Sequence, residues 1–360
     1  MFATLGGSLP AQALDAVVVG GAGRDAGADA GRDARDILVR AAVAAQVSAG
    51  LELVSDGGVR YADLAATLLG GLGLGPDPRA GGRSSRSVPS WRTPILVTGW
   101  EFAAGCTDRA VKQVMIGPYS LGRMGVGNRV VAMPRRRLTL AIAEALNAEL
   151  HALAGAGCPF IEVVEDAATT IGDDPAERRL YRDAQRRLLA GLDDVHVSLA
   201  VRGGNADGAG AGTILDASYR SYLFDLCAGP DNWRLVVDVP GDRGVIVGAA
   251  DAASERPDKL ELLAFAIGYA ASTRGRGHER VGLAISGDMS GLPAAVAVSK
   301  MAAIGEAARL YASEPGSLAR AIDPRAANIR SAALGTDAPA PYDPASPARL
   351  GNASGETPRG

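Results

Sequence analysis

Cysteine and long apolar runs are scarce in this sequence, and both absences exclude classes of protein. The three cysteines, Cys106, Cys158 and Cys227, lie far apart and form no CxxC pair. This spacing argues against a disulfide framework and a cysteine-based zinc knuckle, and it favours a reducing compartment. No apolar run approaches the roughly 18 residues of a membrane-spanning helix, and no basic segment leads into an apolar core at the N-terminus. We therefore expect a soluble, cytoplasmic protein without a membrane partner.

An excess of charge of one sign is also absent. The formal net charge is −3, the isoelectric point is near 5.7, and the arginines are dispersed rather than clustered. The chain thus has no electrostatic footprint for nucleic acid. The lysines are only Lys112, Lys259 and Lys300. With the abundance of Ala, Gly and Arg, this is typical of a GC-rich coding sequence, and we assign it no binding function. A small-molecule substrate is the expected partner, and the sequence indicates no oligomeric state.

What the chain has is a repeated alternation of short apolar runs with longer, Ala- and Leu-rich runs of helical period. The predicted strands cover residues 2–6, 51–56, 111–117, 160–165, 195–201, 235–239, 245–249 and 281–286. The predicted helices cover residues 33–49, 61–72, 135–156, 176–192, 214–226, 257–272 and 293–311. Eight strand signals separated by helices favour closure into a single (β/α)8 TIM barrel over an open doubly wound sheet.

Other segments do not follow this alternation. We divide the chain into a barrel, residues 1–312, and a Pro-, Ala- and Gly-rich tail, residues 313–360, which we expect to be partly disordered. The Gly-rich run 20–32 is similar to a phosphate-binding loop, but it lacks the Lys-Ser/Thr end of such loops, which favours a flexible loop. Residues 75–90 are predicted to form an extended connection near the barrel mouth, followed by a wall strand between Trp91 and Trp100.

Six short motifs, in order along the chain and each at a predicted strand end, resemble motifs of one enzyme family. They occupy residues 4–10 (TLGGSLP), 49–60 (AGLELVSDGGVR), 114–118 (VMIGP), 160–166 (FIEVVED), 200–205 (AVRGGN) and 244–251 (GVIVGAAD). Together they resemble the catalytic barrel of the cobalamin-independent methionine synthase family, within the uroporphyrinogen decarboxylase and methionine synthase-like superfamily. The resemblance covers most of the chain and implies a TIM barrel with methyl-transfer chemistry.

The family holds Zn²⁺ at the barrel mouth, and its Pro-Asp-Cys-Gly-Leu motif supplies a thiolate ligand. Residues 288–292 (DMSGL) resemble this motif, with Met289 at the cysteine position. A thioether is neutral and cannot replace a thiolate in a zinc site. The family's glutamate ligand matches Asp238, which is a shorter carboxylate.

The remaining family positions also lack zinc-binding side chains. The His-x-Cys motif falls on Leu199 and Val201, or on Ser198 and Ala200 in a register shifted by one. Gly58 stands where the family has the glutamate that holds the amino group of homocysteine. The resemblance therefore implies a divergent member without zinc, for which folate is a possible ligand and ordinary methionine synthesis is not expected.

Acidic residues remain at the predicted strand ends, where a TIM barrel presents its active site. Several acids in one pocket raise at least one pKa, which prepares a general acid or base. The expected catalytic residues are Asp238, Glu165, Asp166 and Asp251. The expected substrate-binding residues are Asp56, Arg60, Tyr119, Arg202, Arg243, Asp288 and Met289. We expect Asp238 to be the most sensitive carboxylate, because it occupies a former ligand position.

Each of these residues also has an ordinary structural interpretation. An aspartate after a strand often caps the next helix, as Asp166 or Asp251 would, and arginines commonly form surface salt bridges. A Ser-His-Asp triad with Ser198 and His196 is not supported, because the sequence has no nucleophile-elbow motif such as G-x-S-x-G for it. A single histidine on a strand, such as His196, is more often a packing residue than a ligand.

Two classes of function follow from these observations. The first is a zinc-independent enzyme that performs methyl or alkyl group transfer, elimination or decarboxylation on a small polar substrate. The second is a non-catalytic barrel that binds a small molecule or docks a partner. An authentic 5-methyltetrahydrofolate–homocysteine methyltransferase with an unusual metal site is a further alternative. The two classes differ in whether the carboxylates and arginines converge on one pocket or form separate salt bridges.

Overall fold

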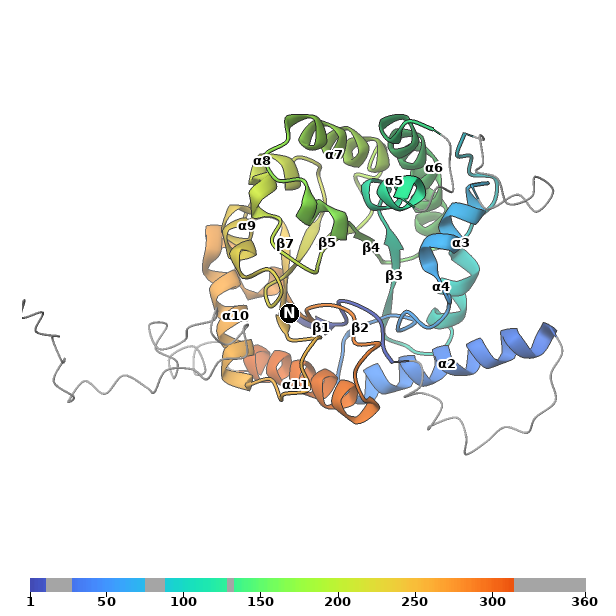
Figure 1. The fold of residues 1–360 in the computed structure, drawn as a ribbon. Helices are drawn as coiled ribbons and strands as arrows, with labels where there is room; N and C mark the ends of the chain where they lie inside the picture. Colours follow the sequence, from blue (N-terminus) through green and yellow to red (C-terminus); the bar gives the residue numbers. More distant parts are fainter. Residues whose placement is uncertain (11–27, 75–87, 128–132, 314–360) are drawn as a thin grey trace, which may run out of the picture.

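The computed structural model describes residues 1–10, 28–74, 88–127 and 133–313 (Figure 1). Eight parallel strands form a nearly closed barrel with helices around it, which confirms the single (β/α)8 TIM barrel. The strands are β1 (Phe2–Thr4), β2 (Leu53–Val54), β3 (Ala110–Ile116), β4 (Phe160–Val164), β5 (Val197–Val201), β6 (Ser221–Asp225), β7 (Gly244–Ala250) and β8 (Val281–Ile285). Neighbours pair in the order β1-β8-β7-β6-β5-β4-β3-β2.

A side-chain hydrogen bond links β1 to the segment that begins β2. Glu52, which directly precedes β2, accepts a hydrogen bond from the Ala3 backbone N–H at 2.8 Å through Oε2. An unpaired backbone N–H at a buried sheet edge costs free energy, so this contact satisfies a donor of β1 that faces the shortest strand.

The helices form a ring outside the strands (Figure 1). They are α2 (Ala28–Ser48), α3 (Leu64–Gly71), α4 (Val97–Ala104), α5 (Pro118–Gly127), α6 (Arg135–Gly155), α7 (Pro175–Leu188), α8 (Ala211–Ile214), α9 (Trp233–Asp238), α10 (Leu260–Ser272) and α11 (Ala294–Ser313). Short 3₁₀ helices are η2 (Asp166–Thr170), η3 (Asp207–Ala209), η4 (Pro230–Asn232), η5 (Thr273–Gly275) and η6 (His278–Arg280). None of the helices in the described part of the chain is long and apolar enough to cross a membrane.

Local sequence explains where several helices begin. Asp174 precedes α7, accepts hydrogen bonds from the N–H groups of Ala176 and Glu177, and is followed by Pro175 at the first helical position. Asp63 caps α3 in the same way by accepting from Ala66 N–H. A side-chain acceptor at the cap satisfies backbone donors that have no partner inside the helix, and proline suits the first turn because it has no N–H to lose.

The barrel has two apolar layers because side chains alternate along each strand. Inside the barrel, side chains from six strands form an apolar cluster: Leu53, Phe160, Val164, Ala200, Leu223, Ile246 and Ala284. Outward-facing strand residues such as Val163 and Leu199 join the larger core under the helices. Part of the barrel interior is therefore packed with apolar side chains, and a site is expected toward the carboxyl ends of the strands.

Our prediction of the sixth strand is wrong. Residues 235–239 belong to helix α9 and its end, and the sixth strand is β6, Ser221–Asp225, inside the predicted helix 214–226. A short apolar run fits a strand or a buried helical turn equally well, so periodicity does not decide between them. In the barrel, Leu223 points inward, whereas Phe224 packs under the helices, which is strand alternation.

The wall strand expected between Trp91 and Trp100 is also wrong, because α4 begins at Val97. The Gly-rich loop predicted for residues 20–32 is wrong at its end, because residues 28–32 form the start of α2. Residues 20–27, 75–87 and 314–360 lie outside the described residues, so the expectations for the rest of that loop, for most of the extended connection and for the tail stay predictions.

Candidate functional site

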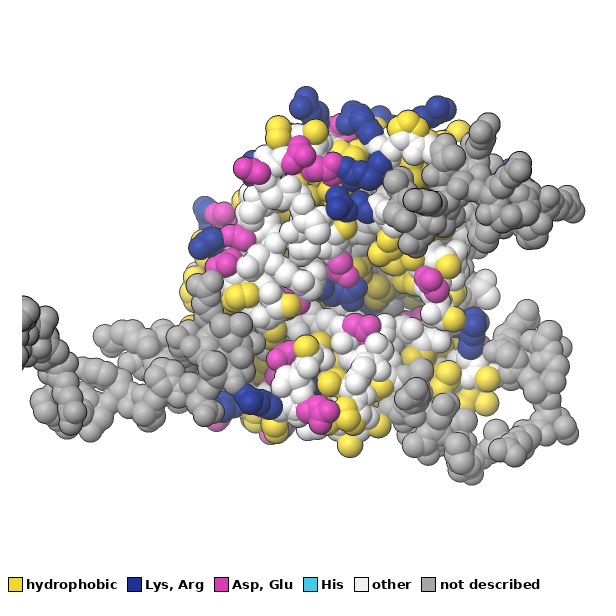
Figure 2. Space-filling model, viewed as in Figure 1, with side chains coloured by type: hydrophobic (Ala, Val, Ile, Leu, Met, Phe, Trp, Pro, Cys, Tyr) yellow, Lys and Arg dark blue, Asp and Glu magenta, His cyan; other side chains and the backbone are white. Residues whose placement is uncertain are grey.

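A pocket of about 240 Å³ opens at the mouth of the barrel, and we call it the mouth pocket. Its walls are the loops after β1 and β2, the strands β3 and β4, and the start of the loop after β5. Figure 2 shows a hollow near the centre of this face, with basic and acidic side chains in it. The polar side chains of the lining are Ser8, Ser55, Asp56, Tyr61, Lys112, Gln113, Glu162 and Arg202.

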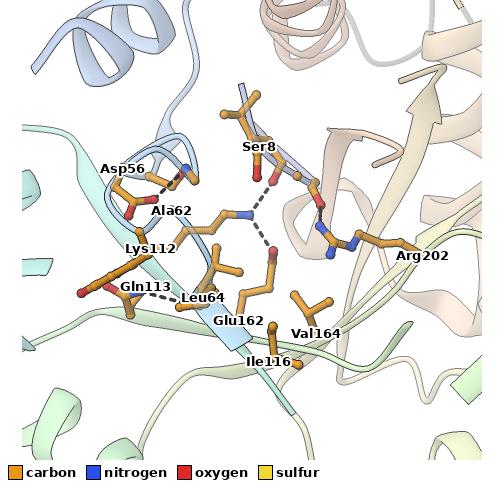
Figure 3. A pocket seen from close by; sticks show the side chains of 17 residues that line it. Ser8, Asp56, Ala62, Leu64, Lys112, Gln113, Ile116, Glu162, Val164 and Arg202 are labelled. Atoms are coloured by element: carbon orange, nitrogen blue, oxygen red, sulfur yellow. Dashed lines mark hydrogen bonds and ion pairs between the residues drawn. The ribbon is translucent and has the colours of Figure 1, made fainter. Parts of the chain in front are cut away.

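A buried ion pair lies in the lining of this pocket. Lys112 Nζ is 2.7 Å from Glu162 Oε2 and donates a second hydrogen bond to the Leu5 carbonyl at 2.5 Å. Both side chains are 1% exposed, and they meet in the centre of Figure 3. Burial lowers the pKa of Lys112, while the charge of Glu162 opposes that shift. The pocket therefore contains an amine held close to a carboxylate and away from bulk water.

Asp56 stands on another wall of the same pocket, in a turn made by two glycines. Gly57 and Gly58 have φ values of +69° and +70°, which other residues rarely adopt, and the Asp56 carboxylate accepts from Gly58 N–H at 2.9 Å. A Cβ on Gly58 would lie 2.3 Å from Ser8 Oγ, so a glutamate does not fit there without rearrangement. Burial raises the pKa of Asp56, although the Gly58 N–H and Arg60 act against this shift.

Tyr61 lies next to Asp56 in the lining. Burial and the nearby charge of Asp56 raise the pKa of Tyr61 to about 12. Its phenol therefore stays protonated at neutral pH, and its hydroxyl lies against α4, where a Cβ on Gly99 would be 2.4 Å from it.

Arg202 follows β5 and connects the mouth pocket to the first loop. Its guanidinium donates to Asp166 through Nη2 at 2.8 Å and through Nε at 3.1 Å, and it also donates to the Gly6 carbonyl. Burial lowers the pKa of Arg202, but the charges of Asp166, Glu162 and Asp288 outweigh burial and raise it. Arg202 is thus a fixed positive charge with a bidentate partner.

The loop after β1 reaches the pocket because it packs closely on the loop after β8. A Cβ on Gly6 would lie 2.0 Å from the Ile285 carbonyl oxygen, and one on Gly7 would lie 2.4 Å from the Gly287 carbonyl oxygen. Met289 N–H donates to the Ser8 carbonyl at 2.9 Å, and the Met289 side chain is fully buried. Met289 therefore anchors the first loop and offers no surface to a ligand in this arrangement.

Two of the expected site residues, Glu165 and Tyr119, belong to a buried network under α5 rather than to the pocket. The Glu165 carboxylate accepts from the N–H groups of Tyr119 and Ser120, from Ser120 Oγ and from Gln185 Nε2, at 2.6–2.9 Å. Tyr119 donates its hydroxyl to Glu177 at 2.6 Å. Burial raises the pKa of Glu165. The carboxylate satisfies the first backbone donors of α5, which is a capping role.

Three other expected residues are engaged locally. Arg60 forms an ion pair with Asp36 and lies over the Phe102 ring, 5.1 Å from its centroid. Asp251 accepts from Ala253 N–H at 2.9 Å, and Asp288 accepts from both the backbone and the hydroxyl of Ser290. Asp288 remains exposed and close enough to Arg202 to act on its pKa.

Asp238 and Arg243 lie at the opposite end of the barrel. Asp238 is the last residue of α9, is exposed, and pairs with Arg274 at 3.2 Å. Arg243 immediately precedes β7, at the strand's amino end, whereas the mouth lies at the carboxyl ends. Asp238 was expected at the end of a strand over residues 235–239, but these residues belong to α9 and its end, so neither Asp238 nor Arg243 lies at the mouth.

Asp225, the last residue of β6, is a strand-end carboxylate that we did not expect in the site. Its two oxygens accept from the N–H groups of Gly203, Cys227 and Ala228 at 2.9 Å. Burial raises the pKa of Asp225. Within the described ranges, no three His, Cys, Asp or Glu side chains are grouped so that they could hold a metal ion.

Sequence reasoning found Asp56 and Arg202 but missed Lys112, Glu162 and Tyr61. A signal was present for the ion pair, because Lys112 and Glu162 are the charged residues of two largely apolar neighbouring strands. Their positions in the register, with Lys112 opposite Phe160 and Glu162 opposite Val114, place both on the inward face of β3 and β4. Charge on an inward face is costly without a partner, which predicts that the two meet.

Comparisons with known proteins complete the description of the site. No protein-family model matches the sequence, and no curated protein matches it.

Solved structures with the same fold do match. A B12-independent methionine synthase from a Shewanella species, in complex with selenomethionine, is 17% identical with a TM-score of 0.68 and covers 87% of this chain and 98% of its own. A putative vitamin-B12-independent methionine synthase from Listeria monocytogenes is 12% identical with a TM-score of 0.64, over 86% of this chain and 97% of its own. A methyltransferase from Methanosarcina mazei is 14% identical with a TM-score of 0.59, over 86% and 94%. The chain therefore has the TIM barrel seen in methionine synthase-like proteins and in a methyltransferase.

Proposed function

We propose that this chain is a methyl- or alkyl-transferring enzyme that acts on a small amino-acid-like substrate in the mouth pocket. The fold it shares with methionine synthase-like structures supports the reaction class. The position of the pocket at the carboxyl ends of the strands supports catalysis, because TIM-barrel active sites lie there.

The observation that carries the proposal is the buried Lys112–Glu162 pair in the pocket lining. A buried ion pair gives little net stability, and apolar residues of the same volume often serve a core as well or better. Its presence beside a pocket, with Asp56 perturbed on another wall, is typical of sites where charge is used chemically.

The volume of the mouth pocket and the charges in its lining support an amino-acid-like substrate. A volume of about 240 Å³ is below the range of pockets that hold drug-sized ligands, so the substrate is small. The lining offers a carboxylate at Asp56 for an ammonium group and a guanidinium at Arg202 for a carboxylate. The Shewanella structure holds selenomethionine, which is an amino acid of this kind.

Asp56 is the proposed proton acceptor or donor. Alkyl transfer to a thiol or an amine releases one proton, and a carboxylate with a raised pKa accepts it at neutral pH better than an ordinary aspartate does. The proposal places no step on a bound metal.

A binding module without catalysis is the second candidate. It is favoured by Glu165, Arg60 and Asp166, which all use their charge in contacts within the chain. A ligand that binds without being converted in the presence of methyl donors would support it.

The first prediction tests the role of Asp56. Asp56→Asn keeps the side-chain shape and removes the charge, so it should lower turnover by about 10²–10⁴-fold, in the range for loss of a general acid or base. Turnover is measured by mass spectrometry on a panel of methyl donors and amino-acid acceptors. Methionine binding, measured by calorimetry, should weaken as well.

Asp238→Asn is the matched control for this experiment, because it makes the same chemical change at the other end of the barrel. Its partner Arg274 is exposed, so we expect activity close to that of the native chain and a stability change within about 1 kcal/mol. If Asp238→Asn were the variant that lost activity, the mouth pocket would not be the active site.

The second prediction concerns stability and pH. The pKa of Asp56 is raised in the folded state, so ionising it costs folding free energy, and that cost appears as pH rises from the ordinary aspartate range through the raised pKa. Asp56→Asn should therefore melt at a higher temperature than the native chain at neutral pH. The difference should vanish at pH values below the ordinary pKa. A difference that is constant with pH would contradict the raised pKa.

A further inference from the structure

Two lysines of this chain are equally buried, but they have different surroundings. Lys112 is 2% exposed and lines the mouth pocket, with Glu162 as its acidic partner. Lys300 is also 2% exposed, donates to Asp258 and to the Arg256 carbonyl at 3.0 Å, and does not belong to the lining of the mouth pocket. Lys112 thus combines burial with a place in the wall of the mouth pocket.

The contacts of Lys112 leave the amine ready for a reaction. Two of its three N–H directions are taken by Glu162 and the Leu5 carbonyl, so one remains. The apolar side chains of Val114, Ile116 and Val164 line the same pocket and exclude water from its walls. An amine in such surroundings loses its proton more easily than a lysine in water.

We propose that Lys112 captures small carbonyl compounds, aldehydes or 2-oxo acids, as a covalent imine in the mouth pocket, with Glu162 as the proton carrier. This activity does not depend on the proposed alkyl transfer, since it needs only the pocket, the amine and the carboxylate.

The reaction needs no proton from outside Lys112, Glu162 and the substrate. The Lys112 ammonium gives a proton to the Glu162 carboxylate, and the neutral Nζ attacks the carbonyl carbon, which forms an N–C bond. A proton moves from nitrogen to the former carbonyl oxygen, giving a carbinolamine. Glu162 then returns its proton to the hydroxyl, the C–O bond breaks, and water leaves. The product is a protonated imine on Lys112 beside an ionised Glu162, so the buried charges remain paired.

Reductive trapping tests the proposal. The native protein is incubated with pyruvate and sodium cyanoborohydride, and in parallel with propanal and the same reductant, then digested and mapped by mass spectrometry. With three lysines in the sequence, the label is assigned directly. We expect the reduced adduct mainly on Lys112 and almost none on Lys300. Pyruvate labelling without propanal labelling identifies 2-oxo acids as the preferred class, and the reverse identifies uncharged aldehydes.

Two outcomes would overturn the proposal. The first is an unlabelled Lys112 with both probes, and the second is labelling of the exposed Lys259 that is as fast as that of Lys112. Glu162→Gln, checked for folding by circular dichroism, should slow Lys112 labelling by about 10²-fold, because it cannot carry the proton. Unchanged labelling in that folded variant would contradict the role of Glu162. Alkyl-transfer activity is not read in this assay, so its absence would not affect the result.

Discussion

Replacing Lys112 alone with methionine is expected to destabilise the barrel by about 3–5 kcal/mol, whereas the double variant Lys112→Met with Glu162→Leu should recover most of that loss. The single change leaves the Glu162 carboxylate buried without its cation, 1% exposed inside the barrel. The double change removes both charges and extends the apolar interior formed by Phe160, Val164 and their neighbours.

Urea and thermal unfolding of the two single variants and the double variant measure this coupling. A double variant that is as unstable as the sum of the single variants would show that the two side chains do not act as a pair. If the double variant is stable but inactive and no longer traps carbonyl compounds, the pair is kept for function rather than for folding, which is what both proposals require.

The sequence predicted the barrel because seven of its eight strands carry a clear local signal. Runs such as residues 160–165 and 281–286 are apolar, short and bounded by Gly or Asp, and β4 and β8 form there. The sixth strand failed for a physical reason: residues 235–239 and 221–225 are both short apolar runs, and only closure of the barrel decides which of them pairs with β5 and β7.

The site was predicted in part. Asp56 and Arg202 were found because each lies within two residues of the carboxyl end of a strand, and these ends meet at the mouth. Lys112 and Glu162 were missed because they lie inside strands, where the sequence alone does not say which alternating face points inward. Asp225 was missed together with its strand. Glu165 does follow a strand, as expected, but its side chain points to the start of α5. Ser120 and Gln185 hold it there by donating hydrogen bonds to its carboxylate.

A buried arginine, Arg276, lies at the opposite end of the barrel. Its replacement is expected to have the largest effect on stability outside the mouth. Arg276 is 1% exposed, and its guanidinium donates to carbonyl groups at the end of α9, in the following loop and at the end of α10. Its acceptors are Val236, Val239, Pro240, Arg243 and Ala270. Val236 and Val239 lie at the carboxyl end of α9, where a helix leaves carbonyl groups unpaired and a positive charge is also favourable. Pro240 and Arg243 belong to the loop that follows, and the Ala270 carbonyl also accepts from Thr273.

Arg276→Met is expected to destabilise the protein by about 3–5 kcal/mol, because it leaves several buried carbonyl groups without a donor while keeping much of the side-chain volume. Arg276→Lys should recover only part of this loss, since an ammonium lacks the planar fork that reaches both helix ends. Arg234→Met is the matched control: Arg234 lies on α9, is 71% exposed and pairs with Asp207, so its replacement should cost about 1 kcal/mol or less. The melting temperatures of the three variants test this expectation. An Arg276→Met variant with the same melting temperature as Arg234→Met would show that water or neighbouring groups satisfy those carbonyls instead.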